Sequence, residues 1–178
     1  GCGCRCRREG SQIISPALFA PEMLECSRGT VPPEWIDFNG HVNVGYYVVG
    51  FDLASVAFLD GVGMGRTYPE RRGFSTFALE MHITYDREIH LNDPFVIHTQ
   101  ILDCDHKRIH MYHELRHGTE GWLSATNEII TMHIDMKTRR SAPFPDDVQK
   151  TLDLIRDAHR DLPVPSGVGR KIGIRRAG

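Results

Sequence analysis

Hydrophobic residues are most concentrated in residues 44–59, where they recur at helical spacing on two sides of the same segment. Small or polar residues interrupt this pattern only at Gly45, Gly50, Asp52 and Ser55. A helix that is apolar nearly all round is normally buried. Asn43 is the expected N-cap, and Gly61 marks the end. We therefore expect a core helix of 16 residues that needs a sheet wrapped around it. It is too short for a membrane span of about 20 residues.

Alternating apolar and polar residues predict β-strands on both sides of this helix. The alternation is strictest in residues 75–86, and turn residues occupy 92–94 and 117–121. One short strand is expected before the helix and a meander of four long antiparallel strands after it: residues 24–31, 75–86, 95–102, 109–116 and 122–136.

Two further segments complete the expected architecture. Residues 61–73 are rich in glycine and charge and are predicted as a loop. Residues 145–161 carry apolar side chains at i+3 and i+4 spacing and are predicted as a helix, followed by an extended tail at 163–178. The fold class is therefore α+β, with an antiparallel sheet that wraps its apolar face around a long buried helix, plus a C-terminal helix.

The length and the charge of the chain narrow the class of protein. At 178 residues a single domain is expected, and a formal net charge of −2 gives no nucleic-acid footprint. No signal peptide or transmembrane segment is predicted, so we expect a cytoplasmic protein that binds no membrane. We expect a disordered or non-native extension at residues 1–22, the domain at 23–145, and a C-terminal helix with a basic tail at 146–178.

Cysteine and histidine residues raise the question of a metal site. Cys2, Cys4 and Cys6 are two residues apart, whereas structural zinc sites use wider pairs with a second pair or histidines at set spacing. No H-E-x-x-H motif is present among the ten histidines. We therefore expect no metal, and we expect the cysteines to be reduced thiols in the cytoplasm.

The most informative chemistry lies just ahead of the long helix. Asp37 precedes a glycine turn that opens into the helix, and His41 and Asn43 fall in the same turn. A helix start has unpaired N–H groups and about half a positive charge, so it can hold an oxygen that gains charge while a carboxylate attacks or activates water. Asp37 is the catalytic candidate, with His41 and Asn43 as positioning candidates; the alternative for all three is a purely structural turn.

The segment Asp37-x-x-Gly40-His41-Val42-Asn43-x-x-Tyr46 resembles the hotdog-fold acyl-CoA thioesterases, in their 4-hydroxybenzoyl-CoA thioesterase-like branch. The resemblance covers roughly residues 24–145. It implies that Asp37 is the catalytic carboxylate, that the amides of Val44 and Gly45 bind the thioester oxygen, and that no cofactor is needed. It also implies an active site at a subunit interface, hence a homodimer or homotetramer.

Further segments are similar to the thioesterases of carnitine catabolism, a group associated with betainyl-CoA and sometimes fused to carnitine dehydrogenase. They are residues 36–44, 80–85, 105–109, 113–114 and 169–174. No G-x-G-x-x-G of a dehydrogenase segment is present in this chain.

An acyl-CoA ligand suggests two sets of binding residues. Rings of Trp35, Tyr46 and Tyr47 are candidates to contact a quaternary ammonium acyl group, although such rings more often pack in a core. Phosphates of coenzyme A need cations, which ordinary surface charge also supplies. The candidates for this role are Lys137, Arg139, Arg140, Arg170 and Lys171.

Two rival functions remain open. Asp37-Phe-Asn-Gly-His41 is superficially similar to the signature of hotdog hydratases, but the spacing from Asp to His is four rather than five and Gly replaces Pro. A non-catalytic module that binds acyl-CoA is the second rival, and it would release no free thiol.

Overall fold

The computed structural model describes residues 11–13, 16–174 and 176. In this part of the chain seven strands form one antiparallel sheet, in the order β1-β2-β4-β5-β6-β3 with β7 beside β6. The strands are Ser11–Ile13 (β1), Leu24–Thr30 (β2), Phe74–Tyr85 (β3), Pro94–Cys104 (β4), Arg108–His117 (β5), Leu123–Asp135 (β6) and Arg140–Ser141 (β7).

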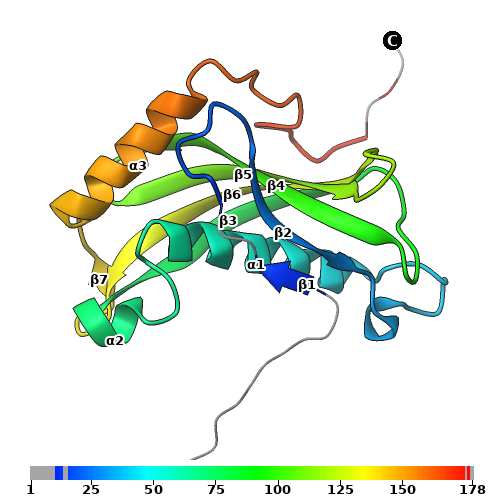
Figure 1. Cartoon of the computed structure of the whole chain (residues 1–178), viewed down its shortest axis with the longest axis horizontal. Helices are drawn as coiled ribbons and strands as arrows, with labels where there is room; N and C mark the ends of the chain where they lie inside the picture. The colour runs from blue at the N-terminus through cyan, green and yellow to red at the C-terminus, as the bar shows by residue number, and fades with distance from the viewer. Residues whose placement is uncertain (1–10, 14–15, 175, 177–178) are drawn as a thin grey trace, which may run out of the picture.

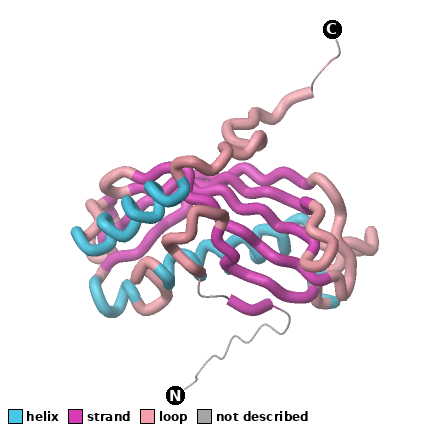
Figure 2. The backbone as a smooth tube through the Cα atoms, turned by 45° about the horizontal axis from the view of Figure 1, so that its top comes forward, coloured by secondary structure: helices cyan, strands magenta, loops and turns pink. Residues whose placement is uncertain are grey.

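Three α-helices accompany the sheet, together with a 3-10 turn at Pro33–Trp35. The long helix α1 spans Val44–Gly61, α2 spans Tyr68–Arg72 and α3 spans Asp146–His159. α1 and α3 lie on different sides of the strands (Figure 1). The backbone trace shows the strands curling around α1 (Figure 2), as the sequence pattern predicts.

The strand order corrects the expected meander of four strands. β4, β5 and β6 pair in sequence order, but β3 pairs with β6 and not with β4. The reason is that β2 occupies the other side of β4. β3 is therefore left at an edge of the sheet, with β6 as its partner.

The segment expected as a loop, residues 61–73, contains the short helix α2. Pro69 lies in its first turn, and Gly73 ends it with a φ of +74°, a left-handed conformation that suits glycine. Tyr68 is fully buried and its hydroxyl lies 2.9 Å from His133 Nε2 on β6. This tertiary contact stabilises α2, which is too short to be predicted from hydrophobic spacing.

The helix α1 is buried on one face rather than all round. Phe51, Ala54 and Phe58 are fully buried against the sheet, whereas Val44 is 56% exposed. With 18 residues, α1 is long and apolar enough to cross a membrane by length and composition, which corrects the length argument made from the sequence. Its contacts with β2, β4 and β5 make it the core helix of this fold.

Part of the predicted N-terminal extension lies within the described residues. Ser11–Ile13 forms β1 and pairs with β2, and the side chain of Leu18 packs against the hydrophobic core. Residues 1–10, with the three closely spaced cysteines, lie outside the described residues. Cys26 and Cys104 are free thiols in the core.

Removing the ring of Phe51 should destabilise the fold strongly, because this buried ring packs between the helix and the sheet. We expect Phe51→Ala to lower the free energy of unfolding by about 3–5 kcal/mol, measured by urea denaturation. The matched truncation Val44→Ala, at an exposed position of the same helix, should cost far less. Equal losses in the two variants would contradict the one-sided burial of α1.

Candidate active site

The loop ahead of α1 is a tight turn tethered at both ends. The N–H of Asp37 donates to the carbonyl of His41 (3.1 Å), and the N–H of Gly40 donates to the carbonyl of Asp37 (3.0 Å). Gly40 has a φ of +82°, which explains the glycine at this point. The N–H of Asn43 donates to the Trp35 carbonyl at 2.8 Å. These bonds place the turn directly at the start of the helix.

The carboxylate of Asp37 is half-buried beside this helix start. Its Oδ1 accepts a hydrogen bond from the N–H of Asn39 at 2.8 Å. Its Oδ2 lies 3.4 Å from the side-chain amide of Asn43, which caps the helix by accepting the N–H of Gly45 at 2.9 Å. Asn43 therefore links the carboxylate to the leading end of α1.

The first backbone amides of α1 differ in availability. The N–H of Gly45 is engaged by the cap, as described above. The N–H of Val44 has no acceptor among the residues that the structure describes. It points from a helix N-terminus, where the helix dipole favours negative charge. Of the two amides expected to hold an oxyanion, Val44 is the free one.

His41 and the aromatic candidates are occupied by local contacts. Nδ1 of His41 donates to the carbonyl of Val42 at 3.0 Å. Trp35 is buried and stacks on Tyr46, and Tyr47 is buried against Tyr85 with ring centroids 5.2 Å apart. Burial also raises the pKa of Tyr47. The rings of the three predicted substrate residues thus serve the core of this chain, and their contact with substrate stays a prediction.

The basic candidates lie in two places away from Asp37. Lys137, Arg139 and Arg140 are exposed at the turn between β6 and β7, where Met136 bonds to Gly73 at the start of β3. The far end of β3 meets the helix start, because the hydroxyl of Tyr85 donates to the Val44 carbonyl at 3.3 Å. The length of β3, at about 3.3 Å per residue, therefore separates the basic turn from Asp37 within one chain.

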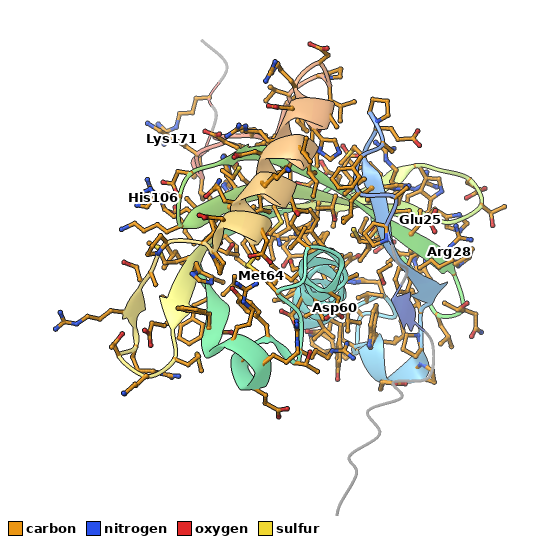
Figure 3. All side chains as sticks on the ribbon, turned by 60° about the vertical axis from the view of Figure 1, so that its left-hand side comes forward. Glu25, Arg28, Asp60, Met64, His106 and Lys171 are labelled. Atoms are coloured by element: carbon orange, nitrogen blue, oxygen red, sulfur yellow. The ribbon has the colours of Figure 1, made fainter. Side chains whose placement is uncertain are left out.

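The other two basic candidates, Arg170 and Lys171, belong to the C-terminal tail. The N–H of Gly169 donates to the Glu128 carboxylate of β6 at 2.8 Å, on the face of the sheet that points away from α1. Lys171 projects outward from this segment (Figure 3). Within one chain the sheet stands between these two cations and Asp37.

Known proteins share both the sequence and the fold of this chain. Residues 31–152 match the family described as the thioesterase-like superfamily. The chain belongs to this superfamily. The expected hotdog thioesterase fold and thioesterase activity are thereby confirmed, and the roles of the individual residues remain predictions.

Individual known proteins are also similar to this thioesterase. A betainyl-CoA thioesterase of Pseudomonas aeruginosa is 36% identical over 81% of this chain and 91% of its own length. An L-carnitine dehydrogenase/betainyl-CoA thioesterase of Rhizobium meliloti is 34% identical over 91% of this chain, which spans 32% of that longer protein. A Staphylococcus aureus protein whose structure was characterised in complex with CoA is 32% identical, with a TM-score of 0.79 over 83% of this chain and 93% of its own.

The thioesterase also has a cavity that sequence reasoning did not identify. It measures about 390 Å³ and opens between the exposed side of α1, the loop before α2, and strands β3 and β6. Met64, which lines it, lies with Asp60 at the end of α1 (Figure 3). Asp52, Ser55 and Arg66 supply polar side chains. The interruptions of the apolar helix pattern at Asp52 and Ser55 were the sequence signals that pointed here.

Two buried side chains of β6 lie in the cavity wall without hydrogen-bond partners in the described structure. Asn127 is fully buried, and both its amide nitrogen and its amide oxygen lack a partner. The hydroxyl of Thr131 is also unpartnered. Buried polar groups are normally paired, so this wall is suited to a polar ligand or water.

Behind the cavity wall, Ser55 belongs to a buried polar chain centred on His113. Its hydroxyl donates to the Phe51 carbonyl (3.1 Å) and lies 3.0 Å from His113 Nε2. The other ring nitrogen of His113 lies 2.8 Å from the Thr99 hydroxyl. Burial lowers the pKa of His113 to about 3, so the ring is neutral in the folded protein.

This buried histidine should make the stability depend on pH. An unfolded histidine titrates near pH 6.5, so between pH 6.5 and 3 the unfolded state binds the proton and stability falls as the pH falls. From pH 7 to pH 5 the loss due to this group is about 2 kcal/mol. Urea denaturation of wild type and His113→Gln at both pH values measures it. The same pH dependence in both proteins would contradict a neutral buried His113.

Proposed function

We propose that this thioesterase hydrolyses a small acyl-CoA with a quaternary ammonium acyl group, of the betainyl-CoA type. The observation that carries the mechanism is the carboxylate of Asp37 beside the free N–H of Val44. The substrate class is supported by the betainyl-CoA thioesterase of Pseudomonas aeruginosa, which covers most of this chain at 36% identity.

The geometry supplies both elements of acyl transfer. The thioester carbonyl oxygen accepts the N–H of Val44 at the positive end of α1, which stabilises the negative charge that develops there. Asp37 either removes a proton from the attacking water or attacks the carbonyl carbon itself. The carbon–sulfur bond then breaks, and the thiolate takes up a proton to give coenzyme A. If water attacks, the free acid forms in the same step. If Asp37 attacks, the acyl group stays on its carboxylate as an anhydride, and a water molecule then hydrolyses this anhydride to the free acid and regenerates Asp37. The Asn43 amide keeps the carboxylate at the helix start throughout.

The active form is proposed to be a homodimer, or a tetramer built from it, paired through β3. Among the described residues β3 has one strand partner and leaves the other edge free. Apolar side chains are exposed along it, with Leu79 54% exposed. An unpaired apolar edge strand is the usual site of strand pairing between chains.

Pairing through β3 would also bring the basic turn to the active site. A two-fold axis makes the two copies of β3 antiparallel, so the start of one strand meets the end of the other. The turn with Lys137, Arg139 and Arg140 lies at the start of β3, and the helix start lies at its end. We therefore assign the phosphates of coenzyme A to this turn of the second copy. Arg170 and Lys171, which the sheet separates from Asp37 within one chain, stay a sequence prediction for the same ligand.

A cytoplasmic location is part of this proposal, because coenzyme A esters and reduced thiols both belong to that compartment. The sequence segments similar to the carnitine-catabolism group support a role in the consumption of a quaternary ammonium acid.

Replacement of Asp37 by asparagine should cut turnover while the fold persists. We expect Asp37→Asn to lower kcat by about a hundred- to ten-thousand-fold, the range for loss of a general base or nucleophile. The measurement is release of free thiol from betainyl-CoA. Glu34→Gln, an exposed acid three residues away, is the matched control and should keep wild-type turnover. Near wild-type hydrolysis by Asp37→Asn would refute the mechanism, and water addition to an enoyl-CoA without thiol release would favour a hydratase.

A charge on the free edge of β3 should separate the subunits. Leu79→Lys is expected to shift the protein to a monomer in light scattering and to lower turnover at least ten-fold, because the basic turn no longer reaches the site. Leu154→Lys, at a 49% exposed position of α3, should leave the assembly intact. A Leu79→Lys protein with unchanged mass and activity would rule out pairing through this edge.

A further inference from the structure

Asp52 is the acidic residue of the cavity, and its surroundings make it an unusual surface charge. It lies on the exposed side of α1 in a stripe of otherwise apolar side chains at i+3 and i+4 spacing, Val48, Val56 and Leu59. A second copy paired through β3 would cover this stripe, since the stripe and β3 line the same cavity. Asp52 would then lose contact with bulk water.

A covered carboxylate needs a cation, because burial of an unpaired charge costs free energy. Arg66 is the basic residue that lines the cavity, but no ion pair joins it to Asp52 in the described structure. The backbone N–H of Arg66 instead donates to the carboxylate of Asp60 at 3.1 Å. The negative charge of Asp52 is therefore left for a ligand to balance.

The remaining wall suits a cation that donates no hydrogen bond. A quaternary ammonium is recognised by negative charge and by oxygen atoms or ring faces that surround its methyl groups. The amide oxygen of Asn127 and the hydroxyl of Thr131 are both buried and unpartnered in this wall. They supply such oxygen atoms in the same cavity as Asp52, and among the described residues its lining contains no other carboxylate.

In the proposed dimer the cavity would face the catalytic turn of the other subunit. It is lined by the first half of β3, including Ser75, Thr76 and Ala78. The strand has a register shift between Ala78 and Glu80, a bulge of the kind found beside active sites. With two antiparallel copies of β3, this half faces the end of the partner strand, where the helix start lies.

We propose that Asp52 of one subunit determines specificity for a positively charged acyl group whose thioester carbonyl is held at the Asp37 of the partner subunit. Asn127 and Thr131 form the wall around the cationic head. This inference rests on the proposed function and adds the group that selects the acyl charge. Each complete site then takes its two carboxylates, Asp37 and Asp52, from different chains.

The test of specificity compares two thioesters of the same shape. In 3,3-dimethylbutanoyl-CoA a carbon atom replaces the nitrogen of betainyl-CoA, so the substrates differ only in charge. We expect Asp52→Asn to lower the ratio of kcat/KM for the cationic over the neutral ester by about ten- to a hundred-fold. Glu70→Gln, an exposed acid of α2 outside the cavity, is the control and should keep the wild-type ratio.

The outcomes of this comparison separate the two proposals. A structural effect of Asp52→Asn would lower both kcat/KM values together and leave the ratio unchanged, which would overturn the role of Asp52. If wild type releases thiol from neither ester, the proposed function itself fails. If wild type hydrolyses both and Asp52→Asn keeps the wild-type ratio, only the specificity proposal fails.

The shared site is tested with mixed dimers. Chains with Asp37→Asn and chains with Asp52→Asn carry different affinity tags, are produced together, and are purified through both tags. If the two carboxylates come from different chains, one of the two sites keeps both, and about half of the wild-type activity on betainyl-CoA returns. If they act within one chain, no site keeps both and activity stays at or below that of Asp52→Asn, which would overturn the shared site.

Discussion

The structure depends on one contact, the packing of a single face of α1 inside the curled sheet. Phe51, Ala54 and Phe58 are fully buried there, and they fix the helix relative to β2, β4 and β5. Because α1 is a long rigid helix, fixing its middle also fixes the position of its first turn. The Asp37 loop is then held by backbone hydrogen bonds to Trp35 and His41, so the location of the half-buried Asp37 carboxylate follows from apolar burial some 14 residues further along the chain.

The same helix carries a buried polar side chain, Ser55, at a point where a polar side chain of the sheet faces it. Ser55 interrupts the apolar pattern on the buried face, and His113 lies against it with Thr99 behind. A neutral, fully hydrogen-bonded histidine is tolerated in a core, because each of its ring nitrogens is satisfied. Asp52 interrupts the pattern three residues earlier, on the exposed side of the helix, and has no hydrogen-bond or ion-pair partner among the described residues of its own chain. The presence or absence of a partner is the physical difference between the two positions.

In the proposed mechanism a single chain leaves the chemistry incomplete. The carboxylate and the free amide lie at one end of α1, while the basic turn and the cavity lie toward the other. The proposed two-fold pairing along β3 would join opposite ends, and the exposed apolar edge would provide free energy for this pairing. Burial of α1 on only one side fits the same conclusion, since the apolar stripe that remains exposed is available to a second copy.

The sequence by itself determined the elements whose signals are local. Periodicity located α1, α3 and the long strands within a few residues, and the turn around Gly40 made Asp37 the catalytic candidate. Helix spacing, alternation and a left-handed glycine are properties of neighbouring residues, so the sequence shows them directly. The pairing of β3 with β6, the short helix α2, the one-sided burial of α1 and the cavity that contains Asn127 were decided only by the tertiary structure. They depend on contacts between segments far apart in the chain, and those contacts leave no periodic trace in the sequence.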